Sequence, residues 1–194
     1  MMDLKQIKRL LKQDLSALPI IKMSLLGDTA TQLLATAIRG IGVDRGYQID
    51  LFEAEYNQVE RQVMDPTSDL YRHDAKYTVV FQSTHKLLEQ YSLMDAAEWP
   101  TLADRRLDFV RTLCSQIGGK IIYMNYPEIE DTIFGSYANK VEGSFTYQIR
   151  KLNYELMRLA EQIPNLYICD IVGLQNKFGR DLMFDSSVYV STEM

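Results

Sequence analysis

Five short, mostly apolar runs, separated by segments with helical periodicity, constrain the fold of this chain more than any other feature. The runs lie at residues 20–27, 47–54, 76–83, 120–126 and 165–172. Several are almost continuously apolar, which is typical of parallel strands that are covered on both faces. Helical patterns occupy the segments between them, at 29–42, 84–93, 101–117 and 144–163.

This alternation predicts an open parallel sheet, because parallel neighbours need long crossover connections. Right-handed crossovers then give a flavodoxin-like, three-layer α/β/α sandwich with five parallel strands in the order 2-1-3-4-5. A chain of 194 residues suits one such domain, so we expect residues 1–194 to form a single unit. In folds of this kind, ligand sites lie beyond the carboxyl ends of the strands.

Charge and cysteine content exclude several classes of function. The chain has 21 Lys and Arg against 26 Asp and Glu, a net charge of −5, which argues against a general nucleic-acid binder. Cys114 and Cys169 are far apart in apolar settings, which favours two buried free thiols and a reducing, cytoplasmic location. No apolar run approaches the length of about 18 residues that a membrane span needs.

Two segments lie outside the strand–helix alternation. Residues 1–18 contain a basic-leaning amphipathic helix, expected over 3–17, which should pack on its own domain; binding to a membrane surface is the alternative. Its apolar face carries Leu4, Ile7, Leu11 and Leu15. The long connection 54–75 is expected to hold a short helix and a turn at Pro66, and either serves function or covers the sheet.

The triplet Gly27-Asp28-Thr29 ends the first predicted strand. Gly27 permits a tight turn, and Asp28 or Thr29 can cap the following helix by accepting hydrogen bonds from its free N–H groups. A hydroxyl in this place is also close to a partial positive charge, which favours a bound anion or a developing oxyanion. The triplet is therefore both a structural turn and a candidate site.

A hydroxyl nucleophile needs a base, usually a histidine. In hydrolases with a Gly-Asp-Ser nucleophile motif, the base lies near the C-terminus as Asp-x-x-His, and the matching stretch here begins at Asp185 and ends at Val188. Valine cannot take a proton, so the ordinary triad cannot form. His85, just past the third strand, is the possible substitute, and the chain's other histidine is His73.

Other polar residues follow the third and fourth strands and are expected at the same edge. Ser83 and Thr84 are candidate substrate contacts or helix caps; Asn125 is a candidate oxyanion donor or a turn residue before Pro127. Gln82 is the other nearby carboxamide. Metal- and nucleotide-binding motifs are absent from the sequence, and no Asp-x-Asp pair occurs, so we expect no metal and no cofactor in this chain.

Several stretches in order resemble the N-terminal domain of FkbH-like proteins, also called haloacid-dehalogenase subfamily IIIC. They are IKMSLLGDTATQLL, YNQVERQVMDPTSDLY, KYTVVFQSTHKLL, NYPEIEDTIFGSYANK and GRDLMFDSSVYVSTEM, which together run from about residue 20 to the end. The resemblance implies a fold similar to SGNH hydrolases. It also implies a C-terminal haloacid-dehalogenase (HAD) domain as partner, absent from residues 1–194, which would hold the magnesium.

FkbH-like enzymes move a glyceryl group from 1,3-bisphosphoglycerate to an acyl carrier protein, with dephosphorylation; other members are named as phosphatases. We therefore expect a non-catalytic or weakly catalytic domain that binds a carrier-bound or phosphorylated substrate. Its expected contacts are Gly27, Asp28, Ser83, Thr84 and Asn125, with Thr29 at the degenerate nucleophile position and Asp185 as the remaining acid. The alternative is an active esterase or acyl hydrolase that uses Thr29 with a relocated base.

Overall fold

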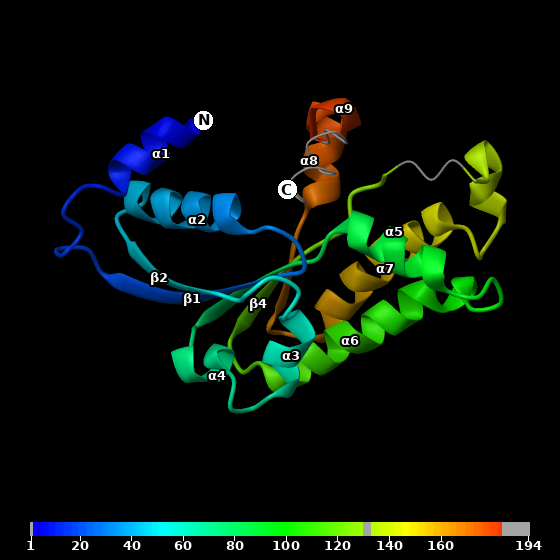
Figure 1. The fold of residues 1–194 in the computed structure, drawn as a ribbon, viewed down its shortest axis with the longest axis horizontal. Helices are drawn as coiled ribbons and strands as arrows, with labels where there is room; N and C mark the ends of the chain where they lie inside the picture. The colour runs from blue at the N-terminus through cyan, green and yellow to red at the C-terminus, as the bar shows by residue number, and fades with distance from the viewer. Residues whose placement is uncertain (1, 130–132, 184–194) are drawn as a thin grey trace.

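A computed structural model describes residues 2–129 and 133–183, and its centre is a five-stranded sheet (Figure 1). The strand order is β2-β1-β3-β4-β5, and all four neighbouring pairs are parallel. This confirms the predicted architecture and order. The strands are β1 (Ile20–Gly27), β2 (Gln48–Glu53), β3 (Tyr77–Phe81), β4 (Lys120–Met124) and β5 (Leu166–Cys169).

Helices cover the sheet from both sides, because the central strands are apolar on both faces. Leu25 and Leu26 point to opposite faces of β1, and both are fully buried. Leu26 belongs to the larger core, which packs against the helices that follow β2, β3 and β4. Leu25 belongs to the smaller core beneath the helix that follows β1. Figure 1 shows these two layers, with α2 (Gln32–Asp44) on one side of the sheet and α3 (Val59–Met64), α5 (Thr84–Leu93), α6 (Leu102–Gln116) and α7 (Phe145–Gln162) on the other.

The long helix α7 confirms the helical pattern expected at 144–163, and its buried apolar residues form a stripe along the helix. Its buried positions step by three and four residues, so they share one face, and that face packs on the sheet. The buried apolar residues of the stripe are Phe145, Ile149, Leu152, Leu156 and Leu159. Ser144 caps the helix by accepting a hydrogen bond from the N–H of Tyr147 at 3.2 Å.

The N-terminal helix α1 (Leu4–Leu10) is shorter than the expected 3–17. It begins with a capping box between Asp3 and Gln6. The chain then leaves the helix, and the Asp14 carboxylate accepts from the N–H of Ser16 at 3.0 Å, a local turn that competes with helix. As expected, α1 packs on its own domain: Ile7 is buried against Gly40 of α2, so closely that a β-carbon there would collide with it.

The connection 54–75 holds two helices, α3 and α4 (Asp69–His73), where one was expected. Val63 and Leu70 are buried in the larger core, so the connection covers the sheet. The shorter elements are η1 (Trp99–Thr101), η2 (Gly135–Lys140), α8 (Ile171–Phe178) and α9 (Arg180–Met183), and α8 was not predicted. Cys114 is buried and Cys169 half-buried, both as free thiols. None of the helices described is long and apolar enough to cross a membrane.

Candidate functional site

The turn after β1 is tied to the turn after β3 by Asp28. This side chain is only 6% exposed, and its Oδ1 accepts a hydrogen bond from the N–H of Ser83 at 2.8 Å. The Asp28 N–H in turn donates to the carbonyl of Phe81 at 3.3 Å. Asp28 therefore holds two loops together at the carboxyl edge, and the first of them carries the candidate nucleophile.

Burial controls the charge of Asp28. Desolvation raises the pKa of its carboxyl to about 6, and this effect exceeds the opposing influence of the Ser83 N–H and of the Arg106 guanidinium. Arg106 is itself buried in α6, where it donates to the Oε1 of Gln90 at 2.9 Å. A carboxyl with a raised pKa and a buried cation thus lie near the turn.

Thr29 lies beside a pocket of about 290 Å³ at this edge. The Thr29 side chain is 4% exposed. Thr31, at the N-cap of α2, makes no capping bond with its side chain, and its hydroxyl donates instead to the Glu53 carboxylate at 2.6 Å. The pocket therefore lies between the start of α2 and the loop after β2. Its lining is Thr29, Ala30, Thr31, Gln32, Glu53, Ala54, Glu55 and Tyr56.

The candidates after β3 are buried and make internal contacts. The Ser83 hydroxyl caps α5 by accepting from the N–H of His85 at 3.2 Å. The Thr84 hydroxyl donates to the carbonyl of Pro127 at 2.9 Å. Gln82 accepts from the Tyr123 hydroxyl at 2.7 Å, within the core. These side chains join the loops after β3 and β4.

Asn125 organises the start of α8. Its Nδ2 donates to Asp170 at 2.9 Å, and its Oδ1 accepts from the N–H groups of Ile171 at 2.7 Å and Val172 at 3.1 Å. Asp170 completes this cap by accepting from the N–H of Gly173 at 2.9 Å. The hydrogen bond from Asn125 and the Gly173 N–H lower the pKa of Asp170. The Asn125 side chain thus fixes the start of α8, a contact that neither of its two expected roles included.

The two histidines lie in different surroundings. His85 is half-buried in the first turn of α5, at the edge that holds Thr29, and desolvation lowers the pKa of its imidazole. His73 contacts the carbonyl of Asp50 through Nε2 at 3.1 Å, in α4. The acid Asp185 and Val188 lie outside the described residues. Lys86, which the sequence reasoning missed, follows His85, and its hydrogen bond to Tyr56 raises the pKa of its ammonium group.

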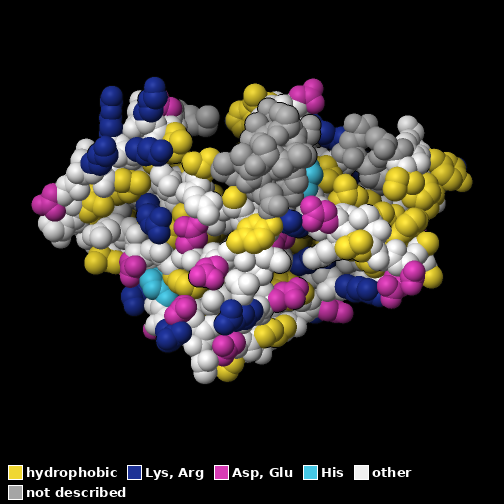
Figure 2. All heavy atoms as spheres, in the orientation of Figure 1, with side chains coloured by type: hydrophobic (Ala, Val, Ile, Leu, Met, Phe, Trp, Pro, Cys, Tyr) yellow, Lys and Arg dark blue, Asp and Glu magenta, His cyan; other side chains and the backbone are white. Residues whose placement is uncertain are grey.

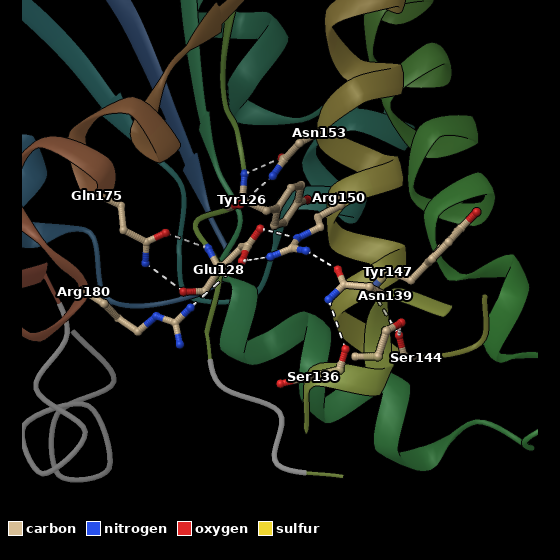
Figure 3. A network of polar contacts seen from close by, with 11 residues as sticks. Tyr126, Glu128, Ser136, Asn139, Ser144, Tyr147, Arg150, Asn153, Gln175 and Arg180 are labelled. Carbon is tan, nitrogen blue, oxygen red and sulfur yellow. Dashed lines mark hydrogen bonds and ion pairs between the residues drawn. The ribbon is translucent and has the colours of Figure 1, made fainter. Parts of the chain in front are cut away.

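A second polar network joins the loop after β4 to α7 and α8 (Figure 3). Arg150 donates to both carboxylate oxygens of Glu128, at 2.7 and 2.8 Å, and the bond lowers the pKa of Glu128. Gln175 pairs with the Glu128 backbone, accepting from its N–H at 2.9 Å and donating to its carbonyl at 2.7 Å. Arg180 lies 4.0 Å from the same carboxylate. These contacts fix α8 to the loop after β4 and line a hollow of about 470 Å³.

A larger hollow, of about 560 Å³, lies at the opposite edge of the sheet, between Ser24, Lys76 and Gly119. We favour the smaller pocket beside Thr29, because ligands of open parallel sheets bind beyond the carboxyl ends of the strands. Across residues 2–129 and 133–183, no group of three or more His, Cys, Asp or Glu side chains could hold a metal ion.

The strand order and the two helix layers define a three-layer α/β domain with a parallel sheet. A lipase/acylhydrolase from Enterococcus faecalis has the same fold, with a TM-score of 0.52 at 14% identity over 82% of this chain and 80% of that one. The family model for the FkbH N-terminal domain matches residues 22–194, so the chain belongs to that family. No match was found among curated proteins.

A solved structure is much more similar. It is the N-terminal part of protein BF1531 from Bacteroides fragilis, described as containing a phosphatase domain and complexed with Mg. The identity is 61% and the TM-score 0.97 over all of this chain. The present chain spans only 52% of that relative.

Proposed function

We propose that this domain binds a substrate group in the pocket beside Thr29 and has little or no hydrolase activity of its own. The observation that carries the proposal is that polar side chains at the strand ends make structural contacts within the domain. Asp28 and Asn125 hold neighbouring loops and a helix start, where a hydrolase would aim such groups at a reacting carbonyl. What remains accessible is the pocket between α2 and the loop after β2.

The family membership suggests the bound group. We propose an acyl-phosphopantetheine arm of a carrier protein or a small phosphorylated molecule, presented to a separate HAD-type catalytic domain that supplies magnesium. The relative of about twice the length, whose description includes a phosphatase domain, supports this arrangement. Lys86 lies next to Tyr56 at the pocket wall, and a cation there suits a phosphate.

The second candidate function is a hydrolase that uses Thr29 with His85 as the base. It is favoured by one observation: desolvation lowers the pKa of His85, so the imidazole is neutral and able to accept a proton near pH 7.

We expect the purified chain to hydrolyse p-nitrophenyl acetate no faster than the Thr29→Ala variant, because no complete triad can be assigned to it. Initial rates at pH 7.5 for the wild type, Thr29→Ala and His85→Ala would be compared with buffer alone. A wild-type rate that falls about a hundredfold or more in both variants would establish the hydrolase instead.

The pocket itself is tested by filling it. Ala30→Trp should abolish binding of phosphopantetheine in calorimetry, because the indole would occupy most of a hollow of about 290 Å³. Ala75→Trp, which fills the hollow at the opposite edge, is the matched control and should leave binding unchanged. Loss of binding in Ala75→Trp alone would move the site to the other end of the sheet.

A further inference from the structure

Helix α1 presents four cations on one side in a protein that is otherwise acidic. Lys5, Lys8, Arg9 and Lys12 follow an i, i+3, i+4, i+7 pattern, so they form one stripe along the helix and the turn that follows it. All four are exposed, and none takes part in an ion pair found among the described residues. Figure 2 shows these basic side chains gathered over α1, at the upper left.

The net charge of the N-terminal segment differs in sign from that of the rest of the chain. Residues 2–14 hold four Lys and Arg against two acidic residues, so their net charge is +2. Since the whole chain is −5, the remainder is −7. The outer face of α1 therefore attracts a polyanion, although the rest of the chain carries a net negative charge.

The packing of α1 indicates whether its partner is a membrane or a protein. A basic helix that binds a membrane inserts its apolar face among the lipids. Here Ile7 on that face is buried against Gly40 of α2, while Leu4 at the start of the helix stays exposed. The capping box at Asp3 fixes the start of the helix. The stripe is thus carried by a helix that packs on its own domain, and its four cations suit a protein surface with a matching row of carboxylates.

We propose that the outer face of α1 is the docking surface for a small acidic protein that carries the ligand of the Thr29 pocket on a flexible arm. The identity of the partner rests on the proposed function. Gly40, where α1 is seated, lies eight residues from Gln32 at the pocket, a span of about 12 Å along α2. A partner docked on α1 would therefore hold its arm within reach of the pocket.

The test measures binding of the full chain to an acyl carrier protein, with and without its phosphopantetheine arm. Replacing Lys5, Lys8, Arg9 and Lys12 together with glutamine should weaken binding of both forms about tenfold or more at about 50 mM salt, because four attractive charges are lost. Glutamine keeps nearly the helix propensity of lysine. The matched control replaces four exposed lysines elsewhere, Lys76, Lys120, Lys140 and Lys177, and should change binding little.

Three results would overturn the docking surface: no binding of either form, an equal loss in both quadruple variants, or wild-type binding to vesicles with 30% phosphatidylserine that exceeds binding to the carrier protein. The proposed function fails separately. If Ala30→Trp leaves the preference for the arm-bearing form unchanged, the pocket assignment is wrong. Binding that is weakened in the α1 variant, and not in the control with four other lysines replaced, would still support the docking surface.

Discussion

Replacing Asn125 with alanine is expected to lower the free energy of unfolding by about 2–3 kcal/mol and to loosen the start of α8. The amide oxygen of Asn125 accepts from the N–H groups of Ile171 and Val172, and its nitrogen donates to Asp170. Alanine leaves these partly buried groups without their partner, and each loss of this kind costs about 1–3 kcal/mol, reduced where water can enter. The change would be measured by urea unfolding.

Hydrogen exchange shows whether the effect is local to α8. In Asn125→Ala, the amides of Ile171 and Val172 should exchange faster by more than the global loss of stability explains. Asn153→Ala is the matched control, because Asn153 makes a similar pair of bonds, to the N–H and carbonyl of Tyr126, at 2.9 and 2.7 Å. It should cost comparable stability while leaving α8 protected. Unchanged protection of α8 in Asn125→Ala would contradict the capping role.

A comparison of α7 with Asn125 shows which features of the structure can be predicted from the sequence. The stripe of α7 is local, since each buried residue follows the last by three or four positions, so its periodicity predicts the buried face. The parallel order of the strands follows in the same way from apolar runs and crossovers. By contrast, Asn125 and Asp170 are 45 residues apart, and Asp28 and Ser83 are 55 apart. No local pattern encodes such partners.

The errors at the ends of elements have local causes. Ile171 and Val172 are apolar like β5, so the sequence suggested a strand up to 172, whereas the strand ends at Cys169 and Asp170 caps α8. The available signal was Asp170, because aspartate is a preferred residue at the N-cap of a helix. In α1, the apolar repeat continues to Leu15, but Asp14 forms its own turn with Ser16, and tertiary packing supports only the part that Ile7 anchors.

Between pH 4 and pH 7, the titration of Asp28 is expected to lower the free energy of unfolding of the wild type by about 2 kcal/mol. Burial raises the pKa of this carboxyl from 3.8 to about 6. The folded protein therefore holds the proton more tightly than the unfolded chain does. The stabilisation is complete below the unfolded pKa and is lost as pH rises through about 6, and a shift of about 2.2 units corresponds to about 3 kcal/mol.

Asp28→Asn isolates this contribution, because the amide oxygen can still accept from the N–H of Ser83 but no longer titrates. The free energy of unfolding of the variant, minus that of the wild type, should therefore increase from pH 4 to pH 7. Asp170→Asn is the matched control with the opposite sign. Hydrogen bonds lower the pKa of Asp170, so its stabilising effect is present above its unfolded pKa and is lost as pH falls. Parallel pH curves for the wild type and Asp28→Asn would show that the turn beside Thr29 does not hold a desolvated carboxyl.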